Sequence, residues 1–454
     1  MSYQSQARRA RLAFVGDVML SRSLRPFAER DYLRLLSLLR DSDLAIGNLE
    51  TVVRHPEEGY PNFTMGTPMT TPPELLADLQ WMGIKLVSIA NNHATDYGVA
   101  GVEAMVAHLR QAQFKAAGAG SNLACARAPA YIDTACGRIA LVAATSFFRP
   151  WNSASDQRPD MHGRPGINPL GFGTSYVVSS SDFETLRGLG ARLGLTQERA
   201  RHSRQFYSAA ELGEQSDDRL TLFGHQFRRG HAHAVETKVN RIDAEANLRA
   251  IAEARRQADW VVFSFHSHEF GDGGRLSAET DAGLTDPAQF AVDFAHAAID
   301  AGADVVTGHG PHLTLGTELY RDRPIFYSLG NFIFQNDTVE QFPAESYRRF
   351  GLGADATPAD FLDARTDCDS RGFPAEAPFW EGCLACVGFD DGKLARLELH
   401  PVDLGFGTSR AQRGRPMLAT GARAEAILGR MERLSNLRGV QFTRDGESLV
   451  VAGH

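Results

Sequence analysis

Short apolar runs that lead into metal-ligand side chains recur five times along this chain, and this pattern constrains the fold more than any other feature. Each run has the length and residue types of a buried β-strand and is followed directly by carboxylate, amide or imidazole groups. The five segments are residues 12–17, 44–50, 86–96, 260–269 and 303–312. Parallel strands of an α/β sheet place their carboxyl ends at one edge, where ligands bind. We therefore expect these polar groups to meet, although they are distant in sequence.

The side chains expected to converge are of the types that hold divalent cations. Carboxylate and amide oxygens suit hard ions, and neutral imidazole is the commonest nitrogen ligand of Zn, Mn and Fe. The group comprises Asp17, Asn48, Glu50, Asn92, His93, His266, His309 and His312. Its clearest part is the turn Gly308-His309-Gly310-Pro311-His312, because Gly and Pro allow the backbone to aim both imidazoles at one point. The pattern predicts a metal site.

Each of these residues, taken alone, also has an ordinary structural interpretation. The alternatives are a helix cap, a turn residue, a solvated carboxylate and a hydrogen-bonded core histidine. The helix cap would be Asp17, the turn residues Asn48 and Asn92, the solvated carboxylate Glu50, and the core histidines His93 and His266. His268 shares the strand face of His266 but lies further out. The same order of strand and ligand in all five segments favours a metal site over separate coincidences.

Several motifs resemble those of the CapA (poly-gamma-glutamate capsule biosynthesis) family. They lie at residues 16–17, 47–50, 91–98, 162–169, 308–312 and 328–332. The resemblance covers most of residues 11–335 and resumes in a hairpin near 382–402. The family is similar in turn to the calcineurin-like metallophosphoesterases. This implies an α/β fold, namely a four-layer αββα sandwich with inserted lid segments and a two-metal site at the strand ends.

The resemblance also implies roles for individual residues. Asp17 and His312 would hold one metal ion. The other would be held by Asn92, His266 and His309. Either Glu50 or Asn48 would lie near the bridging position between them. The implied catalytic residues are Asp17, His93 as the acid/base, and Asp96, which would steady His93; the residues predicted to bind substrate are Arg164, His268 and Asn331.

The chain departs from the phosphoesterase pattern at two places. Met19 stands where the Asp-x-His block has its histidine, and Asn48 stands where a bridging aspartate is usual, with Glu50 two residues on. Losing an imidazole and moving the bridging charge weakens one metal position. We therefore expect one or two divalent ions, with Mn, Zn, Fe, Mg and Ca all left open.

Composition narrows the class of partner. A net charge of −8 argues against general nucleic-acid binding. No apolar stretch reaches the roughly 18 residues of a membrane span. The chain passes directly into the strand at 12–15, which predicts a cytoplasmic protein without a membrane partner. Five Cys suit a reducing compartment, and the CxxC pair Cys383 and Cys386 is expected to lie in an apolar strand.

The pattern of elements predicts an organisation. Residues 11–335 would form the metallophosphoesterase-like core. Residues 150–245 would be an inserted lid or substrate-recognition region, with a helix at 182–212 and a His/Arg group at 224–233 that could equally be a solvated basic loop. Residues 336–381 would be an irregular insert, and residues 382–454 a hairpin and helix that complete the core.

The predicted function is that of a metal-dependent hydrolase acting on a peptide-like (polyglutamate-like) or phosphorylated substrate. A bound ion would polarise a carbonyl or phosphoryl oxygen, and His93 would move a proton at neutral pH. One alternative is a peptide epimerase that abstracts a Cα proton from a ribosomally made peptide. Another is a non-catalytic protein that binds or assembles polyglutamate. Candidates for gripping substrate carboxylates are Arg164, Arg228 and Arg229.

Overall fold

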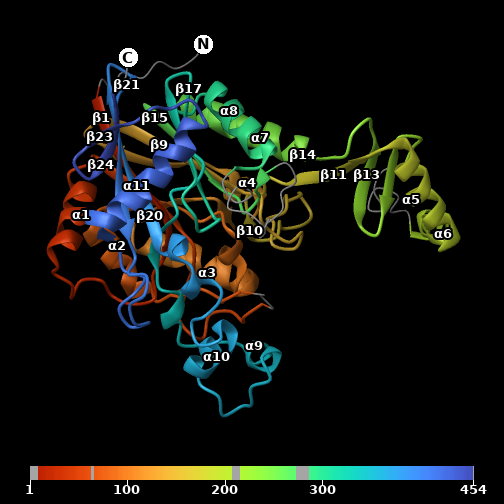
Figure 1. The fold of residues 1–454 in the computed structure, drawn as a ribbon, viewed down its shortest axis with the longest axis horizontal. Coiled ribbons are helices and arrows are strands. Elements are labelled where there is room, and N and C mark those ends of the chain that lie inside the picture. The colour runs from red at the N-terminus through yellow and green to blue at the C-terminus, as the bar shows by residue number, and fades with distance from the viewer. Residues whose placement is uncertain (1–8, 63–65, 207–214, 272–285, 453–454) are drawn as a thin grey trace. The chain divides into compact units, whose positions relative to one another are not determined.

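A computed structural model of the protein describes residues 9–62, 66–206, 215–271 and 286–452 (Figure 1). The chain divides into two compact units. The first comprises Met1–Leu170, Ile242–His268 and Ala295–His454, and the second comprises Gly171–Arg241 and Glu269–Phe294. Within the described residues, no helix has the length and apolar character needed to cross a bilayer.

The first unit contains a ten-stranded sheet with the order β23-β24-β21-β20-β1-β2-β5-β6, in which β19 also pairs with β1 and β22 with β21. Its strands are β1 (Arg9–Met19), β2 (Leu44–Leu49), β5 (Ile84–Ser88), β6 (Lys115–Ala117), β19 (Asn331–Phe334), β20 (Glu381–Asp390), β21 (Lys393–Asp403), β22 (Met417–Leu418), β23 (Thr443–Asp445) and β24 (Ser448–Ala452). Strands β1, β2, β5 and β6 run parallel. Their carboxyl ends therefore share one edge, as the sequence pattern predicts.

A second sheet of six strands has the order β17-β18-β16-β15-β9-β8. Its strands are β8 (Ala130–Thr134), β9 (Gly137–Thr145), β15 (Trp260–His266), β16 (Val305–His309), β17 (Thr317–Tyr320) and β18 (Arg323–Phe326). The inner four strands are parallel. The register places His266 level with His309 on one side and Thr145 on the other. Two predicted ligands thus stand together at one strand edge.

Two hydrophobic cores cover the two faces of the first sheet. Along β1, Leu12 and Phe14 belong to a core shared with the second sheet, whereas Ala13 and Val15 belong to a core shared with helices. These helices are α1 (Arg30–Arg40), α2 (Leu76–Met82) and α3 (Gly98–Gln111). Alternation along a strand separates the two sets of side chains. The prediction of an α/β fold is confirmed at this level.

The C-terminal part of the first unit adds a hairpin and a helix to this core. Strands β20 and β21 pair antiparallel, and Asp391 and Gly392 turn between them with positive φ, as a tight hairpin requires. Helix α11 (Gly421–Asn436) packs its buried face against the core between the sheets (Figure 1). On β20, Cys383 belongs to the core between the sheets and Cys386 to the core on the other face. They are free cysteines in a strand and form no disulfide with each other.

Further helices, strands and turns connect these parts. They are β3 (Val52–Val53), β4 (Thr70–Thr71), β7 (Ala119–Gly120), β10 (Gly166–Ile167), α4 (Leu123–Arg127), α7 (Arg241–Arg255), α8 (Gln289–Asp300), α9 (Ala344–Arg349), α10 (Pro358–Thr366) and the 3-10 turns η1 (Pro73–Leu75), η2 (Asn92–Thr95), η5 (Asn336–Thr338), η6 (Phe373–Ala375) and η7 (Ala377–Trp380). The segment 336–381, expected to be irregular, thus contains two helices. Buried Arg413 forms ion pairs with Asp337 and Asp369 and ties this segment to the loop after β21.

The second unit has a sheet of its own, with the order β12-β13-β11-β14. Its elements are β11 (Phe172–Val178), β12 (Arg219–Leu222), β13 (His225–Arg229), β14 (Ala234–Val239), α5 (Ser180–Arg192) and α6 (Leu195–Phe206). The helix predicted at 182–212 is wrong as a single element, because Gly194 with φ of 74° separates α5 from α6; residues 207–214 lie outside the described residues. Part of the His/Arg group forms strand β13. The role of 150–245 as a lid stays a prediction.

Candidate metal centre

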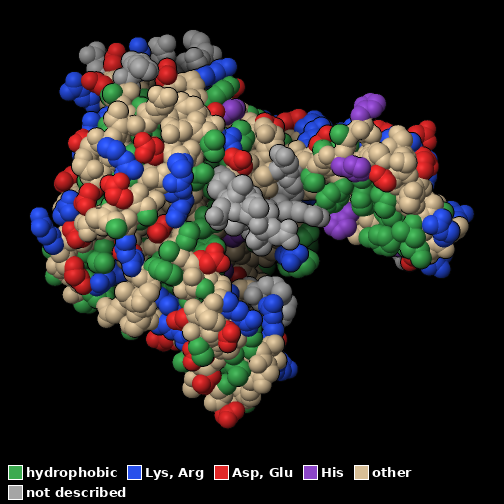
Figure 2. Space-filling model, in the orientation of Figure 1, with side chains coloured by type: hydrophobic (Ala, Val, Ile, Leu, Met, Phe, Trp, Pro, Cys, Tyr) green, Lys and Arg blue, Asp and Glu red, His purple; other side chains and the backbone are tan. Residues whose placement is uncertain are grey.

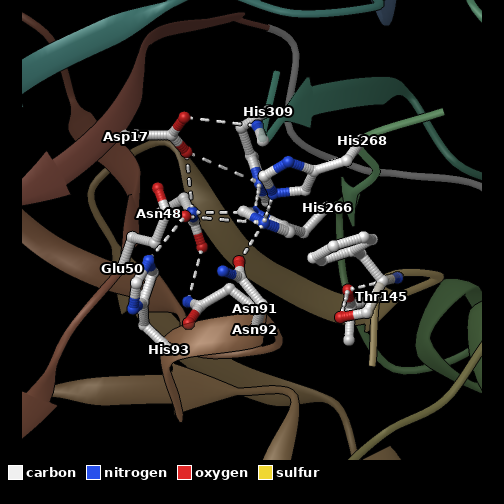
Figure 3. A network of polar contacts seen from close by, with 12 residues as sticks. Asp17, Asn48, Glu50, Asn91, Asn92, His93, Thr145, His266, His268 and His309 are labelled. Atoms are coloured by element: carbon white, nitrogen blue, oxygen red, sulfur yellow. Dashed lines mark hydrogen bonds and ion pairs between the residues drawn. The ribbon is translucent and has the colours of Figure 1, made fainter. Parts of the chain in front are cut away.

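The ends of five strands bring a compact polar cluster together in the first unit (Figure 3). Asp17 lies near the end of β1, Asn48 and Glu50 at the end of β2, and Asn92 and His93 in the turn η2 after β5. His266 and His309 end β15 and β16. Figure 3 shows these side chains pointing toward one another from both sheets. The structure thus brings together residues that are scattered along the chain.

The imidazole nitrogens of the cluster face one another at short range. His266 Nδ1 lies 3.1 Å from His309 Nδ1, and His266 Nε2 lies 3.0 Å from His268 Nε2. Asn92 Oδ1 is 2.7 Å from His266 Nε2. Two atoms that each lie about 2.1 Å from one ion are about 3.0–3.4 Å apart, so the spacing of either histidine pair suits two ligands of one cation. The two ring nitrogens of His266 face opposite sides of its ring, so His309 and His268 stand at different candidate positions.

Three overlapping groups of potential ligands emerge, each with its ligand atoms within 4.8 Å of one another. They are Asp17 with His266 and His309, Asp17 with Glu50 and His312, and Glu50 with His266 and His268. Asp17 and Glu50 each belong to two groups, so each carboxylate is placed to be shared between neighbouring cation positions. His268, predicted to bind substrate, lies among the potential ligands.

Glu50 tests whether a cation fits the cluster. Its side chain is fully buried, and both carboxylate oxygens lack a hydrogen-bond partner. The nearest imidazole nitrogens, on His266 and His93, lie 3.6 and 3.8 Å from Oε1. Burial, and then repulsion from Asp17, raises the pKa of Glu50 well above its usual value. A buried carboxylate is unfavourable unless it is paired or coordinates a metal, and the residues here therefore fit a divalent ion.

Three histidines of the cluster, His266, His268 and His309, are held in the form that binds metals. Burial lowers the pKa of His309 to about 4. Burial and the charge of nearby His312 lower the pKa of His268 to about 3, and burial with the neighbouring imidazoles holds the pKa of His266 well below its usual value. Neutral imidazoles keep a lone pair for coordination. His266, His268 and His309 therefore present neutral nitrogen donors at neutral pH.

Hydrogen bonds fix the orientation of Asp17. Asn48 Nδ2 donates to Asp17 Oδ1 at 2.8 Å, and the backbone N–H of Gly310 donates to Oδ2 at 3.2 Å. Burial by itself would raise the pKa of Asp17, but the hydrogen bond and charge of His312, with help from His309 and Asn48, lower it overall. Asp17 therefore stays ionised. Asn48, predicted as a ligand, directs its amide nitrogen at Asp17.

Two further residues support the cluster, and the sequence analysis did not single them out. Asn91 Nδ2 donates to Asn48 Oδ1 at 3.1 Å, and its own Oδ1 accepts from the backbone N–H of Ala94, which caps η2. Ser264 Oγ lies 2.6 Å from His309 Nε2. Ser264 stands two residues before His266 on the same strand face, so strand alternation could have identified it.

His312 occupies a left-handed backbone conformation, with φ of 60°. Such a conformation is uncommon for residues other than glycine and is found at functional sites. Its Nδ1 lies 3.4 Å from Asp17 Oδ2 and 2.9 Å from Asn331 Oδ1. Asn331, predicted to bind substrate, therefore contacts His312; its Nδ2 donates to Phe379 O at 2.9 Å.

His93 and Asp96 form a hydrogen-bonded pair beside the cluster. His93 Nδ1 lies 2.6 Å from Asp96 Oδ2, which also accepts from the backbone N–H of Met69. The opposite ring nitrogen, Nε2, lies 3.8 Å from Glu50 Oε1. This geometry leaves one nitrogen of His93 facing the candidate metal centre while the other is fixed by a carboxylate. It suits transfer of a proton to or from a bound molecule.

Arg164 lies apart from the cluster in its described contacts. Its guanidinium donates to the backbone oxygens of Ser153, at 2.9 and 3.1 Å, and of Pro150, at 3.3 Å. In the second unit, Arg228 forms an ion pair with Glu236 and Arg229 one with Glu184. The arginines considered for gripping substrate carboxylates are thus engaged within the protein.

Fold and cluster together define a mixed α/β protein with a candidate metal centre at its strand ends. A family model described as "Bacterial capsule synthesis protein PGA_cap" matches residues 11–336, and the chain belongs to this family, whose fold is broadly calcineurin-like. The resemblance to the CapA family inferred from the motifs is confirmed.

Several relatives support this placement. The chain is 33% identical to "Uncharacterized protein y4sH" of Sinorhizobium fredii (strain NBRC 101917 / NGR234), over 94% of this chain and 90% of that protein. It is 23% identical to "Capsule biosynthesis protein CapA" of Bacillus anthracis, over 71% of this chain and 59% of the relative. It is 24% identical to "PGA biosynthesis protein CapA" of Bacillus subtilis (strain 168), over 71% of this chain and 62% of that protein.

Proposed function

We propose that the protein is a metal-dependent enzyme of the hydrolase type that acts on a peptide-like or phosphorylated substrate. The observation that carries the proposal is the buried, unpartnered carboxylate of Glu50 among neutral imidazoles, with the His93–Asp96 pair beside it. In fold, we propose the four-layer αββα sandwich of the calcineurin-like metallophosphoesterases. The core shared by the two sheets and the helices on the outer face of the first sheet support it.

The residues that would hold the ion or ions are Asp17, Glu50, Asn92, His266, His268, His309 and His312. When bound, such an ion polarises a carbonyl or phosphoryl oxygen. His93 Nε2 faces the same space and would take or give the proton of the reacting group. Asp96 would keep Nδ1 of His93 protonated and the ring in place. Asn48 and Gly310 hold Asp17 in its orientation.

A peptide-like substrate is favoured over a phosphate ester by Met19. It stands where the phosphoesterase pattern has a histidine, and its side chain is buried in the core shared with the helices. One position therefore has fewer donors for the paired ions that stabilise a phosphoryl group in transfer. Two relatives are called capsule and PGA biosynthesis proteins, so poly-gamma-glutamate is the first peptide to test. We propose a peptide or small molecule as the partner, rather than nucleic acid or a membrane.

The proposal is tested by metal content and turnover together. Protein purified without added metal is analysed for bound elements, then stripped with a chelator and reloaded with Mn, Zn or Mg. Loaded protein is assayed on a γ-linked glutamate oligomer, a blocked α-peptide and a phosphate ester. We expect at least one ion per chain, and turnover that His93→Ala removes while metal content is kept; the exposed His162→Ala serves as the matched control.

Two outcomes would contradict this proposal. Metal content far below one ion per chain after every reloading would refute the metal centre. A fully loaded protein that binds a peptide but never turns it over would favour the non-catalytic binding protein instead.

The same residues also support a peptide epimerase, because fewer metal donors suit polarisation of one amide carbonyl. In that reaction His93 would remove the neighbouring Cα proton, a proton from solvent would return to the opposite face of that carbon, and no peptide bond would be cleaved. Incubation of the peptide in deuterated water distinguishes the two. Deuterium at one Cα without cleavage indicates epimerisation, and cleavage without such deuterium indicates hydrolysis.

A further inference from the structure

Three large aromatic side chains stand exposed on two loops of the first unit. Tyr60 is 87% exposed, Trp151 65% and Phe147 44%. Aromatic rings of this size are ordinarily buried, and exposed apolar groups that gather in one region mark binding sites. The loops are residues 54–62 and 146–152, which are far apart in sequence. Hydrogen bonds connect both loops to one turn of the first unit.

Both loops are anchored on the turn that carries His93. The backbone N–H of Asn62 donates to Asp96 O at 2.7 Å, and its Nδ2 donates to Thr95 O at 2.7 Å. From the other loop, Asn152 Nδ2 donates to Thr95 Oγ1 at 2.5 Å. Asn62 is two residues from Tyr60, and Asn152 is next to Trp151. Tyr60 and Trp151 therefore stand on loops that are both held by the η2 turn.

Phe147 connects this aromatic group to the candidate metal centre. Its ring centroid lies 4.3 Å from that of His268, and the planes are tilted by 30°. Its backbone N–H donates to Thr145 Oγ1 at 3.2 Å, at the end of β9, where Thr145 is level with His266. A ring in van der Waals contact with a potential ligand and open to solvent on its other side is placed to contact whatever binds at the centre.

The charges nearby do not suit a polyanion. The first loop contains Arg54 and His55 as well as Glu57 and Glu58, and the second loop contains Arg149. Arg54 donates to the backbone oxygens of Glu58 and Pro56, and Glu58 pairs with His108 at 2.7 Å. Arg164 is occupied by backbone oxygens. On the face of the first unit in Figure 2, Lys and Arg side chains alternate with Asp and Glu over the described residues. A chain of glutamates would need a concentration of positive charge, whereas the charges of the two loops are mixed in sign, so an apolar group matches these loops better.

We propose that Tyr60, Phe147 and Trp151 form an aromatic subsite that receives an aromatic or large aliphatic side chain of a peptide substrate. The inference rests on the proposed function, since it places the peptide backbone of the substrate at the candidate metal centre. It narrows that function from peptides in general to peptides with an apolar residue beside the reacting bond. Polyglutamate, which has no such side chain, would then be a poor ligand.

The test compares two probes on protein loaded with Zn or Mg. One is the blocked dipeptide N-acetyl-phenylalanyl-alanine amide, and the other is a γ-linked glutamate oligomer, each followed by saturation-transfer NMR. We expect the aromatic dipeptide to bind at least about tenfold more tightly than the oligomer. Phe147→Ser and Trp151→Ser should each weaken its binding about fivefold or more. The control Leu437→Ser removes a side chain that is 72% exposed at the end of α11, and should leave binding unchanged.

Metal content and the thermal transition of each variant show whether it folds. Tighter binding of the glutamate oligomer would overturn the inference, as would dipeptide binding that neither substitution weakens, or no binding of either probe to loaded protein. Failure of the proposed function is seen separately, as protein that does not retain metal. Binding to metal-free protein still measures the subsite in that case.

Discussion

Replacing Glu50 by Gln should change stability in opposite directions with and without metal. In the absence of an ion the carboxyl group is buried, forms no hydrogen bond through either oxygen, and has its pKa raised by burial and then by the charge of Asp17. An unsatisfied buried polar atom costs about 1–3 kcal/mol, and more when it is charged. Gln has nearly the same shape but carries no charge. We expect Glu50→Gln to stabilise the chelator-treated protein by about 2 kcal/mol.

The size of the thermal shift follows from the length of the chain. An unfolding entropy of about 2 cal/mol/K per residue gives roughly 1 kcal/mol per degree for 454 residues, so the variant should melt about 2 °C higher in chelator. Saturation with an ion at about a hundredfold excess over its Kd stabilises the wild type by about 2.7 kcal/mol. The variant, which lacks a charged ligand, should lose nearly all of this gain and, given its advantage of about 2 kcal/mol in chelator, melt at most about 0.7 °C below the wild type in metal.

Scanning fluorimetry in chelator and in Mn, Zn or Mg measures both shifts. The exposed Glu340, replaced by Gln, is the matched control and should shift neither transition. The reasoning is refuted if Glu50→Gln melts lower than the wild type in chelator, or if the variant gains as much stability from metal as the wild type does. Either result would mean that Glu50 is satisfied by the protein alone.

Three other substitutions test supporting parts of the structure. Ser264→Ala removes the hydroxyl that lies 2.6 Å from His309 Nε2, and it should weaken metal affinity about tenfold as measured by titration calorimetry. Unchanged affinity would show that Ser264 does not orient His309. Asp96→Asn should lower turnover at least about tenfold while metal content stays constant, and loss of metal would instead make Asp96 part of the metal site. Burial lowers the pKa of His400, so this group contributes stability above pH 6.5 that is lost as the pH falls through its folded pKa. The melting temperature of the His400→Gln variant should therefore fall less than that of the wild type between pH 7.5 and about pH 5. An equal fall would show that His400 does not cause this part of the pH dependence.

The meeting of the strand ends could be predicted because parallel strands leave their carboxyl ends at one edge. On β15, Trp260 and Val262 face the other sheet, and Ser264 and His266 continue that face into the cluster. The same alternation on β16 leads from Val305 to His309. For these two strands, a period of two is enough to assign the direction of each side chain.

The direction in which the Asp17 side chain points could not be predicted from the two-residue alternation of a strand. Alternation from Leu12 and Phe14 would place Asp17 on the opposite face, together with Ala13 and Val15. The register between β1 and β2 shifts between Phe14 and Asp17, and this irregularity returns the carboxylate to the side of the cluster. Gly16 permits it, because a Cβ there would lie 1.8 Å from Gly330 O. The close approach depends on a segment more than three hundred residues away in the chain.

The sheet of the second unit could also not be predicted from the hydrophobic pattern of the sequence. The hydrophobic cluster of Phe183, Leu220 and Leu222 in this unit has too few apolar residues to give a strong periodic signal. Its strand β13 consists mostly of polar residues and pairs with β11 and β12 on its two sides. Pairing with strands that are remote in sequence decided the structure of this segment over its local composition.

Asn48 and Glu50 show how one strand can direct two polar side chains, two residues apart, into the candidate metal centre. Leu44 and Ile46 face the second sheet, while Ala45 and Leu49 face the helices. Asn48 continues the first of these faces, and Glu50, two residues on, points to the same cluster. A shift of two residues preserves the face of a strand, whereas a shift of one would reverse it. The longer glutamate side chain reaches back toward Asp17 and His312, and this leaves the amide of Asn48 free to hold Asp17. Glu50 thus presents its carboxylate to the same cluster as Asn48 from just beyond the end of β2, and Asn48 contributes a hydrogen bond that orients Asp17.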